Sequence, residues 1–247
     1  MTTPKDGLPP ELAQLAEQDA GRGVSNDIAD QLTPIVTVLQ NNSPQCDSRG
    51  ADYVDNAEPG RFWLRNSDPP IRDWIDVQPL TMRRGFTEWL RDRQGYVGFH
   101  DDLPDDVDVH IDVDSGKRTY VRRDNKNVLE DTRQLFLMID GQLHMLPAAG
   151  TKHTFVRALE TFFHTQRNPT SGTVLPAFAH LLRLTTVPRS NAKGRWFDVK
   201  FETIEQDGRR VWPSLADYQK AKALTESVER GLLTSSPVAA IGGPKAA

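Results

Sequence analysis

The clearest alternation of apolar and polar positions lies in residues 181–201, LLRLTTVPRSNAKGRWFDVKF. Leu182, Leu184 and Thr186 alternate with Arg183 and its polar neighbours, and the pattern resumes after a glycine-containing loop. A period of two residues is typical of strands with one buried face. The segment therefore predicts a hairpin of two strands, and its loop, 188–195, carries cations and no acid.

The same pattern predicts further elements along the chain. The expected strands are 35–40, 61–66, 77–90, 96–100, 133–139, 142–147, 177–187 and 195–204. The expected helices are 151–166 and 214–230, the second with Ser214 as its N-cap. Many short strands around one long helix predict a β-rich α+β fold. We expect an OB-like antiparallel barrel or half-open sheet, with one long internal helix and a C-terminal helix.

The expected domain organisation is simple. We expect residues 1–26 to be a mobile N-terminal segment and residues 27–231 to form a single OB-like domain. Within that domain, residues 101–116 read as an acidic loop. The small-residue stretch 232–247 is expected to be a disordered tail.

Charge is unevenly distributed along a chain whose formal net charge is −4. Residues 101–114 hold seven aspartates and no Lys or Arg, whereas residues 150–212 hold ten Lys/Arg against five Asp/Glu. A uniformly basic, histone-like binder is excluded by this balance. A local basic face on an acidic protein remains compatible with nucleic-acid binding.

The cysteine count and the polarity of the first residues predict the cellular compartment. Cys46 is the only cysteine, so no intramolecular disulfide forms, which fits a reducing cytoplasm. The first residues are polar and lack the apolar core of a signal peptide. No apolar stretch approaches the roughly 20 residues that span a membrane. We expect a cytoplasmic protein without a membrane partner.

Known catalytic motifs are missing from the sequence, which has no GxxxxGK[ST], G-x-S-x-G or H-E-x-x-H. We therefore expect no enzyme activity, no catalytic residues, no metal and no cofactor. One alternative stays open: His100, Asp101 and Asp102 begin the acidic run, and a metal-dependent nuclease needs carboxylates that converge on Mg²⁺.

Arginine recurs next to aromatic residues, which is what single-strand binders require: cations for the phosphates and rings on which bases stack. Alternation places Trp196 with Asp198 and Lys200, opposite Phe197, which we assign to the core. By the same argument Trp63 shares a face with Arg61. The ordinary alternative for each ring is a place in the core.

The predicted nucleic-acid site combines these residues. Trp63 and Trp196 are expected to stack on bases. The expected phosphate contacts are Arg61, Arg65, Arg83, Arg84, Arg189, Lys193 and Arg195.

Four segments carry a resemblance: GVSNDIADQLTPIVTVLQNNSPQ, EPGRFWLRN, LPAFAHLLRLTTVPRSNAKGRWFDVKFE and DYQKAKALTESVERG. They span most of residues 23–231 and resemble bacteriophage-encoded single-stranded DNA-binding proteins with an OB-type core. The resemblance implies coating of single-stranded DNA, no reaction, and partnership with phage or host replication and recombination proteins. The tail SSPVAAIGGPKAA departs from the acidic tail of many such proteins.

The leading hypothesis is therefore sequence-independent binding of single-stranded DNA in phage replication or recombination. The alternatives are a structural or assembly protein of the virion, and the metal-dependent nuclease. The sequence leaves the oligomeric state open, a homo-oligomer included.

Overall fold

The computed structural model of the protein describes residues 33–231 except positions 66, 94, 114–116, 169 and 193. The expected mobile segment 1–26, the expected disordered tail 232–247 and Lys193 thus lie outside the described residues.

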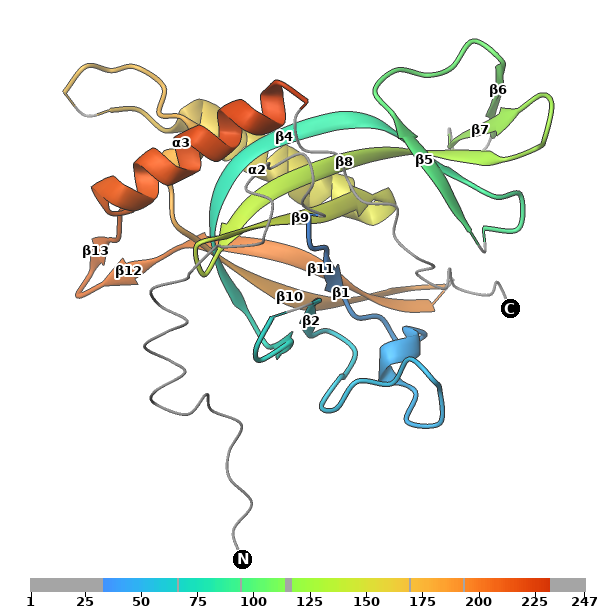
Figure 1. Ribbon diagram of the computed structural model, residues 1–247, viewed down its shortest axis with the longest axis horizontal. Coiled ribbons are helices and arrows are strands. Elements are labelled where there is room, and N and C mark those ends of the chain that lie inside the picture. The colour runs from blue at the N-terminus through green and yellow to red at the C-terminus, as the bar shows by residue number, and fades with distance from the viewer. Residues whose placement is uncertain are drawn as a thin grey trace, which may run out of the picture.

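The fold is built on one curled antiparallel sheet (Figure 1). Its strands follow the order β11-β10-β4-β8-β7-β6, with β5 paired to β4 and β9 paired to β8. Their bounds are β4 Ile75–Trp89, β5 Tyr96–His100, β6 Val107–Ile111, β7 Arg118–Arg122, β8 Val128–Ile139, β9 Gln142–Ala149, β10 Leu182–Asn191 and β11 Gly194–Thr203. The predicted β-rich fold, a half-open sheet compatible with an OB-like barrel, is confirmed.

Two predicted hairpins are present with the expected pairing. Ile139 of β8 faces Gln142 of β9 across Asp140 and Gly141, which have φ of 50° and 74°. Positive φ at both turn positions is the geometry that an Asp-Gly pair favours. Between β10 and β11, Leu184 lies opposite Phe201, so the alternation read from the sequence gives one shared apolar face.

Two helices cover the sheet. α2 (His153–Thr165) follows the short turn η3 (Gly150–Lys152) and buries Phe155, Val156 and Leu159. α3 (Leu215–Glu229) is capped by Ser214, whose side-chain oxygen accepts a hydrogen bond from the amide of Asp217. No helix within the described residues is long and apolar enough to cross a membrane.

The two faces of β8 separate two apolar clusters. Leu135, Leu137 and Ile139 join the larger cluster on the inner face of the curl, which α2 packs against. Phe136 and Met138 lie on the other face, where α3 contributes Ala221 and Val228 to the smaller cluster. We call these the inner and outer faces of the sheet.

A small sheet completes the fold beside β11. It consists of β1 (Val36–Val38), β2 (Phe62–Leu64) and β3 (Ile71–Arg72). The Gln40 side chain joins it to β11, because its Nε2 donates to the Phe197 carbonyl (3.0 Å) and its Oε1 accepts from the Phe197 amide (2.8 Å). The side-chain amide of Gln40 therefore takes the place of a strand partner along β11.

The remaining short elements are η2 (Pro44–Cys46), η4 (Ala177–Ala179) and the β12 (Glu205–Gln206) and β13 (Arg209–Arg210) hairpin.

One expectation from the sequence needs correction. The acidic segment 101–116 is not a loop throughout, because Val107–Ile111 form β6, paired with β7. The sequence VDVHI alternates apolar and polar residues with the period of a strand, but the surrounding aspartates are typical of a loop and mask this period.

Candidate nucleic-acid interface

The inner face of the sheet continues beyond the apolar core toward β5, β6 and β7. Residues directly opposite one another in an antiparallel pair share a face. Arg84 lies opposite Arg133, and Phe86 lies opposite both Asp131 on β8 and His100 on β5. Because Leu135 on the same side of β8 belongs to the inner cluster, these polar and aromatic residues also lie on the inner face.

An aromatic pair stands on this part of the face. The rings of Phe86 and Tyr120 meet edge to face, with centroids 5.2 Å apart and planes at 69°. Both side chains are only half-buried. They come from β4 and β7, which β8 brings together, so the sequence gives no local sign that the two rings meet.

Two guanidinium groups share one carboxylate beside the rings. The Arg84 side chain is 67% exposed and makes one contact of 3.4 Å with Asp131. Arg133 is more buried and holds the other oxygen of Asp131 at 2.5 Å. The Asp131 charge is therefore largely engaged by Arg133, and Arg84 remains accessible to an anion from solvent.

A buried ionic network supports the rings from the side of β5. The Glu88 carboxylate, 3% exposed, accepts hydrogen bonds from Arg122 (3.0 Å) and Asn127 (2.7 Å), and lies 2.7 Å from Nε2 of His100. Burial raises the pKa of Glu88, but the hydrogen bonds from Asn127, Arg122 and His100 outweigh it and hold the pKa below its ordinary value. Arg122 also pairs with Asp106, so the network ties β5 and β7 to β4.

The tip of the β10–β11 hairpin carries the other predicted aromatic residue. Arg189 lies directly opposite Trp196, and Arg195 lies opposite Ser190 on the other face. Arg189 is 61% exposed and contacts the Asp198 carboxylate at 3.9 Å. Trp196 is half-buried, and within the described part of the chain its indole nitrogen has no hydrogen-bond partner.

The predicted alternation along β11 is confirmed. Phe197 packs against the inner cluster and over Gly60, where an added Cβ would lie 2.6 Å from its ring. Asp198 lies on the opposite side of the strand with Trp196, as the period of two residues requires.

Lys152 and His153 lie between β11 and β8. Nε2 of His153 donates a hydrogen bond to the carbonyl of Asp131 (3.0 Å). Burial lowers the pKa of Lys152, and the attraction of Glu130 and Asp198 opposes that shift, which places Lys152 near the Asp198 carboxylate of β11. We call Arg84, Phe86, Tyr120 and Arg133 the inner-face site, whereas Arg189 and Trp196 lie on the face of β10 and β11 opposite Phe197 and form a separate pair.

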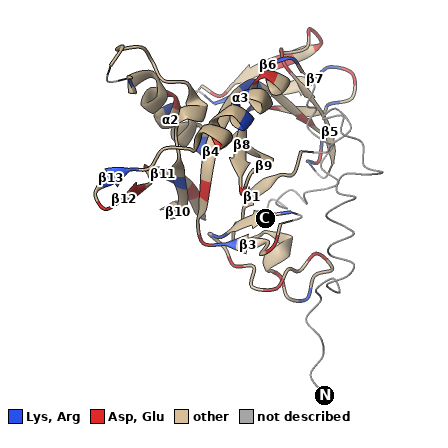
Figure 2. Ribbon diagram, turned by 60° about the vertical axis from the view of Figure 1, so that its left-hand side comes forward, with Lys and Arg blue, Asp and Glu red and all other residues tan. Residues whose placement is uncertain are grey.

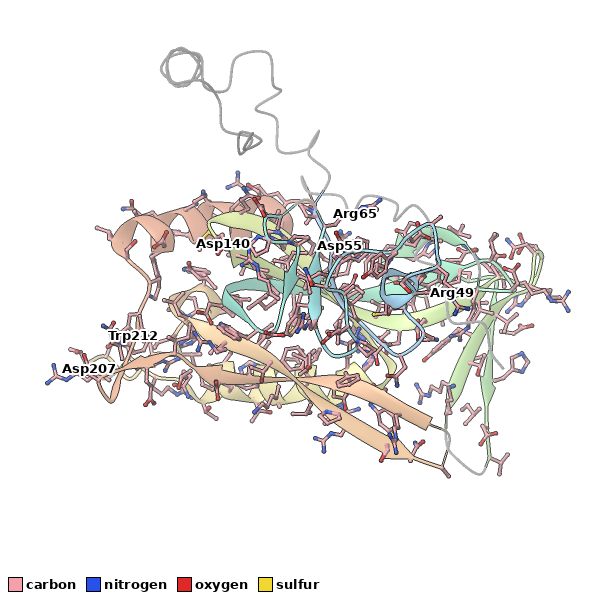
Figure 3. All side chains as sticks on the ribbon, turned by 90° about the horizontal axis from the view of Figure 1, so that it is seen from below. Arg49, Asp55, Arg65, Asp140, Asp207 and Trp212 are labelled. Atoms are coloured by element: carbon pink, nitrogen blue, oxygen red, sulfur yellow. The ribbon has the colours of Figure 1, made fainter. Side chains whose placement is uncertain are left out.

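Arg61, Trp63 and Arg65 lie elsewhere. Arg61 is held by Asp73 (2.9 Å) and Glu58 (3.3 Å), and the Arg65 guanidinium lies 5.9 Å from the ring centroid of Trp63. Figure 3 shows Arg65 across the molecule from the tip of the β10–β11 hairpin. The structure therefore does not bring the residues predicted from the sequence together in one place.

Arg83 is also separated from Arg84. Its Nε donates to Asp101 Oδ1 at 2.6 Å, a second hydrogen bond joins the same two side chains, and its guanidinium lies over Phe99. Consecutive strand residues point to opposite faces, so Arg83 lies on the outer face. Figure 2 shows acidic and basic positions interspersed along the sheet, not one continuous basic face.

The residues of the nuclease alternative do not converge. His100 contacts Glu88 on the inner face, whereas the next residue, Asp101, binds Arg83 on the outer face. Among the described residues, no group of three or more His, Cys, Asp or Glu side chains is arranged to hold a metal ion. This alternative gains no support from the geometry.

A family described as Pam3 phage gp34-like protein matches residues 4–234, almost the whole chain. The chain belongs to this family, which confirms the phage-encoded part of the resemblance. No curated protein and no solved structure matches the chain.

Proposed function

We propose that the protein binds single-stranded DNA, without sequence preference, at the inner-face site. The observation that supports this most directly is the edge-to-face pair of Phe86 and Tyr120 next to the accessible guanidinium of Arg84. Single-strand binding needs that combination, since a cation holds the phosphate and a ring face stacks on a base.

The ion pairs decide which arginines are available to phosphate. Arg84 contacts Asp131 at 3.4 Å and is mostly exposed, so it can turn to a phosphate while Arg133 keeps Asp131 paired. Arg83 is held by a two-pronged pair, which is stronger and geometrically fixed. The proposal therefore keeps Arg84 and leaves out Arg83.

The rings of the inner-face site are partly buried and partly open to solvent. Phe86 and Tyr120 are both half-buried, so one part of each ring is anchored and another part is open. A base stacked on such a ring contributes about 1–3 kcal/mol and requires no particular base, which is why the proposed binding is independent of sequence.

Fluorescence anisotropy of a labelled poly-dT oligonucleotide, with the matching duplex beside it, tests the proposal. We expect binding of the single strand that weakens steeply between low and moderate salt, because each neutralised phosphate releases counterions. Absence of binding at low salt, or equal affinity for the duplex, would overturn it.

A structural or assembly role in the virion is the second candidate. The observation that favours it is a row of exposed apolar residues on the outer strand β6. This role predicts self-assembly without nucleic acid and tolerance of charge reversal at Lys193 and Arg195. Under the DNA-binding proposal, charge reversal at Arg84 would weaken binding.

A further inference from the structure

β6 ends the order of the main sheet, and no described strand pairs with its second edge. In Figure 1, β6 and β7 lie at the end of the molecule farthest from β12 and β13. Val109 and Ile111 on β6 are 45% and 59% exposed. An outer strand with exposed apolar side chains is a template for pairing with another strand.

The backbone groups of β6 have a fixed orientation. The amide of Asp112 donates to the carbonyl of Lys117, and the carbonyl of Asp106 accepts from the amide of Arg123. The even-numbered residues therefore direct their backbone groups toward β7. Because the direction alternates along a strand, Val109 and Ile111 direct their amides and carbonyls toward the open edge.

We infer that β6 of one molecule pairs antiparallel with β6 of a second copy of this chain, forming a two-fold symmetric dimer. The sequence VDVHIDV, residues 107–113, is complementary to itself in such a pair. Centred on Val109, the pairing sets Asp108 opposite His110, and centred on Ile111 it sets Asp112 opposite His110. Apolar residues face apolar residues in both registers.

The aspartates also discourage other partners. Carboxylates on an outer strand repel an acidic strand and are costly to desolvate against an apolar one, so they limit indiscriminate pairing. A second copy of the same strand supplies the histidine that each carboxylate faces, whereas the register centred on His110 would set Asp108 opposite Asp112 and is disfavoured. A two-fold axis makes every such contact twice.

The dimer would extend the inner face from one molecule to the next. Val109 lies opposite Tyr120 on β7, so the apolar row and the Phe86–Tyr120 pair share a face. Antiparallel pairing about a two-fold axis keeps that face on one side of the joined sheet. The dimer itself does not depend on the proposed DNA binding, because the contact involves no nucleic acid.

Sedimentation velocity of the full chain without DNA tests the inference. We expect a dimer whose fraction rises between about 1 and 100 micromolar, the range of small interfaces. A single monomeric species throughout that range would overturn the inference. This outcome is independent of the anisotropy experiment, so failure of one does not imply failure of the other.

Two variants and one control locate the contact. Val109→Pro removes an amide directed at the open edge and no hydrogen bond to β7, so the fold is retained and the dimer is lost. Ile111→Lys keeps every backbone group and sets two like charges near the axis, which also abolishes the dimer. Val97→Lys on β5, where Val97 is similarly exposed, leaves it intact. Dimers of unchanged stability in both β6 variants would overturn the inference, with far-UV circular dichroism to verify folding.

Discussion

Arg83 and Arg84 are consecutive residues of β4, yet their guanidinium groups lie on opposite faces of the sheet and are held differently. Arg83 is bound through two hydrogen bonds to Asp101, whereas Arg84 makes a single 3.4 Å contact with Asp131 and stays accessible. Strand alternation places them on opposite faces but does not tell which of the two is available to a phosphate. The pairing of β4 with β8 does, because it sets Arg84 beside Phe86 on the inner face.

Glu88→Gln is expected to destabilise the protein by about 3 kcal/mol, because it leaves Arg122 and His100 without their buried counter-charge. Chemical denaturation measures the change in the free energy of unfolding. Glu226→Gln is the control, since Glu226 forms an exposed pair with Arg230 at 3.7 Å and its loss is expected to cost less than about 0.5 kcal/mol. Equal effects of the two substitutions would contradict the network described here.

The protein is expected to lose stability as the pH falls, because of His180. Burial, together with the nearby Arg210, lowers the pKa of His180 to about 4 in the folded protein, whereas an unfolded histidine titrates near 6.5. Between these values only the unfolded chain takes up the proton, so this residue's contribution is present above pH ~6.5 and is lost as pH falls toward ~4, by on the order of 3 kcal/mol.

The His180→Gln variant isolates that contribution. Denaturant unfolding at several pH values should show a weaker loss of stability on acidification in the variant than in the parent protein. If the variant and the parent protein show the same pH dependence, His180 does not cause the loss of stability on acidification.

Gly85→Ala is expected to destabilise the fold by about 1–3 kcal/mol through overpacking. An added Cβ would lie 2.3 Å from the carbonyl oxygen of His100 and 2.4 Å from the Phe99 ring, and the backbone atom cannot rotate away. Gly98→Ala on β5 is the matched control, because a Cβ there meets no atom within 4 Å. Thermal unfolding compares the two, and a Gly98→Ala effect as large as that of Gly85→Ala would argue against this explanation.

The rings of the inner-face site are expected to contribute to DNA affinity. Replacing Phe86 or Tyr120 by leucine should weaken binding of single-stranded DNA by about 1–3 kcal/mol each if a base stacks on the ring. Trp212→Leu is the control, because Trp212 is also exposed but lies at the other end of the molecule (Figure 3). Anisotropy titrations measure the affinity of the three folded variants for single-stranded DNA. A larger loss of affinity in Trp212→Leu than in the Phe86 and Tyr120 variants would place the DNA contact elsewhere.

Local patterns predicted local structure well. The alternation around Phe197 and the Asp140-Gly141 turn identified two hairpins, and Ser214 marked the start of α3. The acidic run concealed β6, because its aspartates read as a loop although VDVHI has the period of a strand.

The candidate site depended on contacts that no local pattern contains. Phe86 and Tyr120 meet only through the register of β4, β8 and β7, over 34 residues of chain. Asp73 binds Arg61 and Asp101 binds Arg83, and in both pairs the carboxylate is likewise distant from the arginine in the sequence. Arginines can therefore be recognised from a sequence, whereas their availability to phosphate is a property of the fold.

The most direct test of the proposed function is the salt dependence of poly-dT binding in Arg84→Ala and Arg83→Ala, measured side by side. Arg84→Ala is expected to weaken binding and to reduce the slope of log affinity against log salt by about 0.7, the value for one phosphate contact on a single strand. Arg83→Ala is expected to leave the slope unchanged. Equal losses in the two variants, or a loss in Arg83→Ala alone, would contradict binding at the inner face.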